Sequence, residues 1–146
     1  MSLTASARSI AGSLRNEVDV NGRHSITTDE PRSLGGTDQG PAPHELLPAM
    51  LASCVSTMIV LYAQRRNWRL DAVRVDVTYD TDSTPRRVEI AVHLPERLAA
   101  DQVERLRRVA QMCPARRALE AGFAFDEQFA LDLPAATLTN TPAWRR

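Results

Sequence analysis

The sequence of 146 residues contains no lysine, because all eighteen of its basic residues are arginine. This absence excludes a Schiff-base lysine, a lysine general base and the lysine of a phosphate-binding loop. The chain also has no excess of charge, since eighteen acidic residues balance the eighteen arginines. No overall electrostatic field therefore attracts nucleic acid or an anionic membrane, and we expect neither as a partner.

Long hydrophobic runs are scarce as well. The longest, residues 55–63, is interrupted by Ser56 and Thr57, and the first thirty residues hold no run long enough for a signal peptide. We therefore expect a cytoplasmic protein. Its 43% hydrophobic and 25% charged residues are ordinary for a globular chain, and its length fits one domain with one core.

The chain has only two cysteines, Cys54 and Cys113, which are too few for a disulfide framework and do not form a Cys-x-x-Cys pair. Together with the three histidines they match no zinc spacing, so we expect no metal site. The sequence also lacks the motifs of serine hydrolases, phosphate-binding loops and dinucleotide-binding folds. We expect no cofactor, and the two thiols are either core residues or reactive ones.

Hydrophobic periodicity and turn residues divide the chain into strands and helices. Asn21-Gly22 is the strongest hairpin signal, and the stretch 29–43, rich in glycine and proline, predicts a long loop. A loop of this length is unusual in a small domain unless it has a function, although a flexible connector is the alternative. The expected elements of a single domain, 1–146, are an N-terminal β-meander (4–28), the loop (29–43), a central helix (44–67), a β-hairpin (73–94), two helices (101–121), a terminal strand (123–133) and a frayed tail (134–146).

Cys54 falls in the apolar central helix, on the face of Leu47, Met50 and Met58, so its thiol is expected to point into apolar surroundings. A small core residue is the simplest interpretation. Because burial raises the pKa of a thiol, a nucleophilic Cys54 needs a cation within reach. Arg32, in the preceding loop, is the candidate.

Cys113 comes directly before Pro114, at the expected start of a helix. Free backbone N–H groups at a helix start favour a thiolate, and Arg116 and Arg117 add positive charge there. The alternative is a buried residue that closes the preceding helix.

Two segments, GGTDQGPAPHELLPAMLASC (35–54) and CPARRAL (113–119), resemble the OsmC/Ohr family of osmotically induced and organic-hydroperoxide-resistance proteins. A glycine- and proline-rich loop, a Pro-x-Glu-Leu-Leu entry, a helix reaching Ala-x-x-Cys, and a Cys-Pro that opens a later helix recur in that order. The resemblance extends over the whole chain, from the N-terminal hairpin to the terminal strand, and favours an OsmC-like subgroup.

The resemblance implies an α+β fold in which antiparallel sheets pack around a long central helix and two protomers form an intertwined homodimer. The reactive cysteine of the family falls on Cys54 and the resolving cysteine on Cys113. Family members reduce organic hydroperoxides through these thiols and are often re-reduced by a dithiol such as dihydrolipoamide.

The chain departs from the family pattern at its acidic residue. Founding members carry a catalytic glutamate ten residues before the reactive cysteine, where this chain has His44, and Glu45 follows one residue later as in many relatives. The resemblance gives Glu45 the role of holding the family's arginine. By position that arginine is Arg32. The alternatives are Arg8, Arg15 and Arg23.

The resulting hypothesis is a cofactor-free peroxidase that acts on organic hydroperoxides in oxidative stress defence, with Cys54, Cys113, Arg32 and Glu45 as its site. The main alternative is a stress-associated binding module of the same fold with weak or no peroxidase activity. A thiol-dependent acyl transferase is a third interpretation, which the lack of a paired histidine disfavours.

Overall fold

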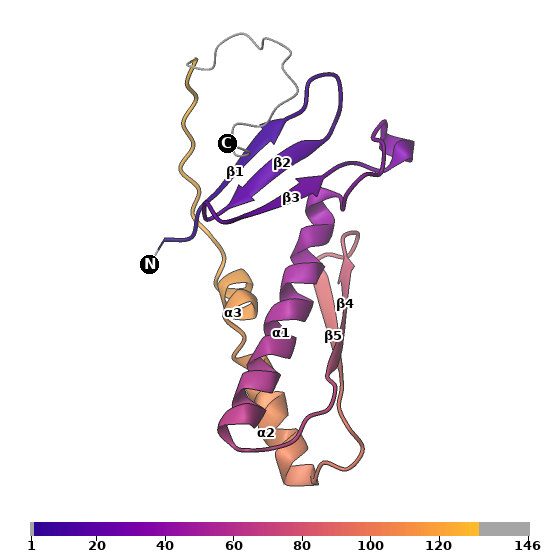
Figure 1. Cartoon of the computed structure of the whole chain (residues 1–146), viewed down its shortest axis with the longest axis vertical. Helices are drawn as coiled ribbons and strands as arrows, with labels where there is room; N and C mark the ends of the chain where they lie inside the picture. The colour runs from indigo at the N-terminus through magenta and orange to yellow at the C-terminus, as the bar shows by residue number, and fades with distance from the viewer. Residues whose placement is uncertain (1, 132–146) are drawn as a thin grey trace. The chain divides into compact units, whose positions relative to one another are not determined.

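The computed structural model of the chain describes residues 2–131, which form two compact units (Figure 1). The N-terminal unit comprises residues 2–40 and 124–131, and the central unit comprises Pro41–Phe123. Each unit is described by itself below.

The N-terminal unit contains an antiparallel sheet of β1 (Ala5–Ser9), β2 (Asn16–Val20) and β3 (His24–Thr28), in that order. Both residues of the predicted hairpin turn lie between β2 and β3 with positive φ, 55° at Asn21 and 65° at Gly22. This left-handed backbone at both central positions is what a tight two-residue hairpin turn requires, which explains the strength of the Asn-Gly signal.

Residues 29–40 form a loop that hydrogen bonds to one buried carboxylate hold together, although most of its residues are exposed. The carboxylate of Asp29, 1% exposed, accepts the N–H groups of Glu30, Thr37 and Gln39, and the hydroxyl of Thr37 donates to it at 2.6 Å. A Cβ atom on Gly36 would lie 1.8 Å from the carbonyl oxygen of Glu30. The loop also contains the 3-10 turn η1 (Arg32–Leu34), so a buried carboxylate organises the segment that carries Arg32.

We expect the substitution Asp29→Asn to lower the melting temperature at neutral pH by several degrees, because an amide would direct N–H hydrogens at backbone donors. The Thr37 hydroxyl, with the three N–H groups, holds the pKa of Asp29 below its ordinary value. Ionised Asp29 therefore stabilises the fold above its unfolded pKa, and this stabilisation is lost as the pH falls through the folded-state pKa. Thermal unfolding at pH 7 and pH 3 checks both points.

The exposed neighbour Asp38 provides the matched control for this prediction. The substitution Asp38→Asn should leave the melting temperature unchanged, since asparagine also tolerates the positive φ of 59° found there. Equal effects of the two substitutions would contradict the assigned role of Asp29.

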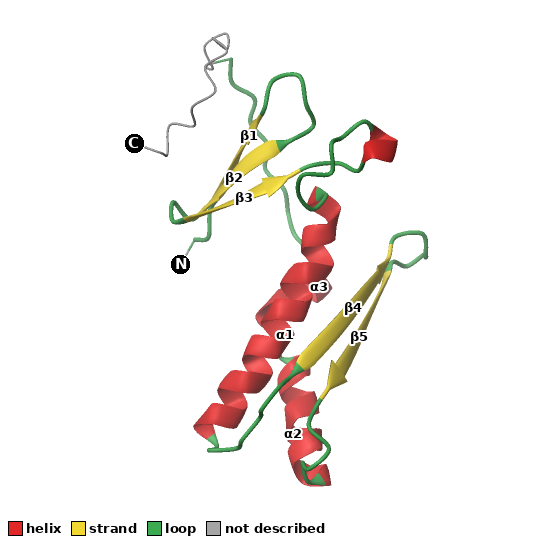
Figure 2. Ribbon diagram, turned by 45° about the vertical axis from the view of Figure 1, so that its right-hand side comes forward, coloured by secondary structure: helices red, strands yellow, loops and turns green. Residues whose placement is uncertain are grey.

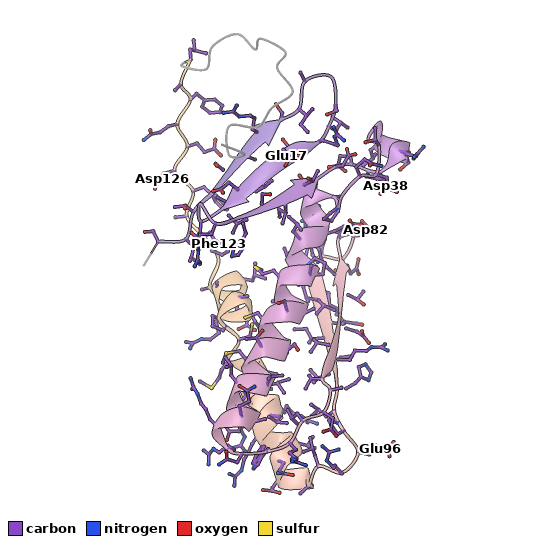
Figure 3. All side chains as sticks on the ribbon, in the orientation of Figure 1. Glu17, Asp38, Asp82, Glu96, Phe123 and Asp126 are labelled. Carbon is purple, nitrogen blue, oxygen red and sulfur yellow. The ribbon has the colours of Figure 1, made fainter. Side chains whose placement is uncertain are left out.

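The central unit is built around one long helix, α1 (Leu46–Arg65), which follows the 3-10 turn η2 (Pro43–Glu45). An antiparallel hairpin of β4 (Arg74–Asp80) and β5 (Arg87–His93) packs against α1, as do α2 (Ala100–Gln111) and α3 (Pro114–Ala121) (Figure 2). Asp82 marks the turn of the hairpin and Glu96 the connection from β5 to α2 (Figure 3). Antiparallel sheets and a long helix confirm the expected α+β class.

The buried stripe of α1 differs from the predicted face. Leu51, Val55, Ile59 and Ala63 are its buried residues, whereas Met50 is 45% exposed. The reason is that α1 is apolar around most of its circumference, so periodicity alone does not select the face that packs. By length and composition, residues 43–65 could even cross a membrane, a property shared by core helices.

The predicted terminal strand, 123–133, is wrong over the residues that can be compared. Residues 122–131 run without regular secondary structure, and positions 132–133, like the expected tail, lie outside the described residues. Phe123 and Phe125 alternate with smaller residues as in a strand, and Phe129 and Leu131 resume the alternation after the polar residues 126–128. Alternation of large and small residues by itself does not establish a β-strand.

Candidate active site

The two cysteines are in direct contact in the central unit. The thiol of Cys113 donates to the sulfur of Cys54 across 2.7 Å, and both are free thiols. A disulfide bond is about 2.05 Å long, so only a small approach separates this pair from a covalent link. Two residues 59 positions apart in the sequence thus form one site.

Cys54 is placed by α1, one residue before the buried Val55. Successive residues of an α-helix are rotated by about 100°, so Cys54 lies beside the buried stripe and not within it. Its side chain is therefore half-buried, in contact with the core yet reachable from outside.

Cys113 is placed by the break between α2 and α3. Pro114 has no N–H and disfavours a helical conformation in the residue before it, and Cys113 accordingly has φ −52° and ψ 123°. Its N–H still bonds to the carbonyl of Ala110, while its own carbonyl accepts the N–H of Arg117 and begins α3. The residue is fully buried, packed with Val55, Ile59 and Leu106.

Burial and two neighbouring residues shift the pKa of Cys54. Burial raises the pKa of its thiol, the hydrogen bond with Cys113 raises that pKa further, and the backbone N–H of Ala115 lowers it. The first N–H groups of a helix have no partner inside the helix, and Ala115 follows the proline that opens α3. The start of α3 thus acts on Cys54, which sequence reasoning missed because it applied the Cys-Pro signal to Cys113 alone.

We expect Ala115→Pro, which deletes that N–H, to slow the alkylation of Cys54 at pH 7 by about tenfold, since a hydrogen bond to a charged group contributes about 1.5–3 kcal/mol. Alkylation by iodoacetamide as a function of pH checks this, and its midpoint should move to higher pH. The control Ala115→Gly keeps the N–H and should react like the wild type. An unchanged profile in Ala115→Pro, with circular dichroism intact, would contradict the role of this N–H.

Within the described residues, neither Arg32 nor Glu45 makes a hydrogen bond or ion pair with the two sulfurs. Arg32 is exposed and belongs to the N-terminal unit, so its pairing with Cys54 stays a prediction. Glu45 accepts the N–H of Ala42 at 2.9 Å, and it precedes Cys54 by nine residues, roughly 13 Å of helical rise. The rings of His44 and Tyr79 are in T-shaped contact, with their centroids 5.8 Å apart.

Among the alternative arginines, Arg15 differs from the others. Its Nε is buried and has no hydrogen-bond partner within the described residues. A buried donor without an acceptor costs free energy. Among the alternatives, Arg15 is therefore the strongest competitor of Arg32 as the arginine that pairs with Cys54.

A cavity of about 340 Å³ in the central unit is lined by residues of α1, β5, α2 and α3. Its walls are mostly apolar and include Val55, Ile90 and Leu106, but neither cysteine lines it. Val55, Ile59 and Leu106, which line the cavity, also pack with Cys113.

Residues 36–128 match the family model of OsmC-like proteins, a range that spans well over half of the chain and includes both cysteines. The chain belongs to the OsmC family. This confirms the resemblance seen in the sequence, and the Cys54–Cys113 pair lies in the matched region of the OsmC domain. No curated protein matches the chain.

Solved structures of OsmC-type proteins share the fold. The chain is similar to a Psychrobacter arcticus protein named for osmotic stress induction and detoxification, with 26% identity, 78% of this chain and 85% of that chain covered, and a TM-score of 0.66. An organic hydroperoxide resistance protein OsmC from Legionella pneumophila is 23% identical over 82% and 89% of the two chains, with a TM-score of 0.58. The OsmC-like protein of Mycoplasma pneumoniae is 20% identical over 82% and 88%, with a TM-score of 0.63.

Proposed function

We propose that this OsmC-family protein is a cofactor-free, thiol-dependent peroxidase that reduces organic hydroperoxides in oxidative stress defence. The observation that carries the proposal is the 2.7 Å contact between a half-buried and a fully buried thiol. A reactive sulfur with a second thiol already at its side can be oxidised and then protected by disulfide formation.

The reaction starts when the Cys54 thiolate attacks the distal oxygen of the hydroperoxide. A sulfur–oxygen bond forms, the oxygen–oxygen bond breaks, and the alkoxide takes a proton and leaves as an alcohol. Cys113 then attacks the sulfur of the Cys54 sulfenic acid, a disulfide forms and water leaves. A dithiol reductant, of the dihydrolipoamide type in the family, restores both thiols and becomes a disulfide itself.

A guanidinium is required for the first step, because burial and the neighbouring thiol raise the pKa of Cys54. Arg32 is assigned this role, in which it stabilises the thiolate and then the departing alkoxide. Glu45, at the start of α1, is assigned the role of orienting it. With no lysine in the chain, only arginine can supply this charge from a long side chain.

The substrate is assigned as an organic hydroperoxide because the half-exposed side of α1 is apolar. Met50 is 45% and Leu61 42% exposed on this helix, and Met58 is half-buried. Side chains of this kind bind an alkyl or aryl group better than hydrogen peroxide.

The same exposed side chains support an intertwined homodimer as the working state, with the substrate bound at the interface between the two copies. A helix that leaves large apolar residues uncovered in one chain is stabilised when a second copy covers them. Light scattering of the purified protein should give twice the chain mass.

We place this dimer in the cytoplasm, where thiols are kept reduced.

Steady-state consumption of cumene hydroperoxide with dihydrolipoamide as reductant tests the proposed function. We expect sustained turnover and a clear preference over hydrogen peroxide at equal concentration. Peroxide that stays unconsumed in the presence of fully reduced protein would contradict the proposal.

A stress-associated binding module with weak or no peroxidase activity is the second candidate. The raised pKa of Cys54 favours it, since without a cation nearby few thiolates exist at neutral pH. The same assay separates the two candidates, because a binding module leaves the peroxide unconsumed, and it also retains both thiols when peroxide is added without dithiol.

A further inference from the structure

The two sulfurs of the site differ in their access to solvent. Cys113 is 0% exposed, and the residues that enclose it, Val55, Ile59 and Leu106, belong to the same unit. Cys54 is half-buried, on the edge of the buried stripe of α1. A molecule from solution therefore reaches the pair from the side of Cys54.

Formation of the disulfide preserves this difference. The Sγ atoms are already 2.7 Å apart, so reaching the disulfide length of about 2.05 Å requires only a fraction of an ångström of movement. No helix has to unwind to join them. The side chains that cover Cys113 in the reduced protein consequently cover it in the oxidised protein too.

We propose that the reducing thiol attacks the sulfur of Cys54 in the disulfide, and that Cys113 is the leaving group. This inference rests on the proposed thiol cycle. It assigns Cys54 every bond to an external molecule, first to the peroxide oxygen and then to the reductant, while Cys113 bonds only to Cys54.

The exchange is balanced at each step. The reductant thiolate forms a bond to Cys54, the bond between Cys54 and Cys113 breaks, and its electron pair leaves on Cys113, which takes up a proton. The second thiol of the reductant then attacks the reductant sulfur bound to Cys54. This releases Cys54 as a thiolate and the reductant as a cyclic disulfide.

The experiment uses full-length protein whose disulfide is made with the thiol oxidant diamide, so that it does not depend on peroxidase activity. The oxidised protein is mixed with glutathione, quenched in acid, unfolded, and treated with N-ethylmaleimide to block the released thiol. Peptide mass spectrometry should find at least about tenfold more glutathione on Cys54 than on Cys113, with maleimide on Cys113. Glutathione on Cys113, or equally on both, overturns the proposal.

A second measurement covers the case in which the disulfide re-forms before the quench. In the reduced, folded protein, the variants Cys113→Ala and Cys54→Ala each retain one thiol. N-ethylmaleimide should label the thiol of Cys113→Ala at least about ten times faster than that of Cys54→Ala. Equal rates, or the reverse order, also overturn the proposal. A protein that fails the peroxide assay and passes these tests would lose the proposed function but keep the assigned order of attack.

Discussion

Cys54→Ser is expected to abolish hydroperoxide reduction, whereas Cys113→Ser should preserve the first reduction and stop the cycle after it. A serine hydroxyl does not take an oxygen atom from a peroxide, so the first variant should lose more than about a thousandfold in rate. In the second variant the sulfenic acid of Cys54 forms normally but has no thiol beside it. A second peroxide then oxidises it to the sulfinic acid, which does not return to the thiol.

Rapid-mixing measurements of peroxide loss, followed by intact mass, distinguish these variants. Cys113→Ser should react once at a rate close to the wild type and then accumulate protein with two added oxygen atoms. Cys113→Ala should behave like Cys113→Ser, which excludes an effect of the serine hydroxyl at this buried position. Ser53→Ala, on the exposed side of α1, should be fully active. Sustained turnover by Cys113→Ser at the wild-type rate would remove Cys113 from the mechanism.

Arg32→Met is expected to lower the second-order rate constant for cumene hydroperoxide by about a hundred- to a thousandfold, the usual cost of losing one charge-stabilising donor. The remaining surroundings raise the pKa of Cys54. Without the guanidinium, less thiolate is present at pH 7, so alkylation of Cys54 should also require a higher pH than in the wild type.

Three matched variants, Arg8→Met, Arg15→Met and Arg23→Met, decide whether this assignment is correct. Each removes one guanidinium from the same unit and should leave the alkylation profile of Cys54 unchanged. Loss of activity in Arg15→Met instead, with Arg32→Met active, would transfer the role to Arg15, whose Nε is buried without an acceptor within the described residues.

Features determined by neighbouring residues were predictable from the sequence. Asn21 and Gly22 adopt the positive φ values that their hairpin turn requires, and Pro114 ends one helix and begins the next, leaving Cys113 at the junction. Both effects act within one or two residues of the chain, so no knowledge of the tertiary structure was needed. The family resemblance then assigned the cysteine pair, whose contact no spacing rule could supply.

Features determined by tertiary packing were not predictable in the same way. The apolar surface of α1 did not reveal that Val55, and not Cys54, lies on the buried stripe. From the sequence, the loop around Asp29 is only a polar stretch rich in glycine and proline. The structure shows that three of its backbone N–H groups bond to one buried carboxylate. The action of the Ala115 N–H on Cys54 depends on α3 packing beside α1, a contact between distant parts of the sequence.

The most direct measurement of the central claim is a single turnover without reductant. One equivalent of cumene hydroperoxide is added to fully reduced protein, and the products are counted by titration of free thiols, disulfide mapping and chromatography of the alcohol. The account predicts one equivalent of alcohol and one disulfide between Cys54 and Cys113. Intact hydroperoxide with both thiols still titratable would contradict it.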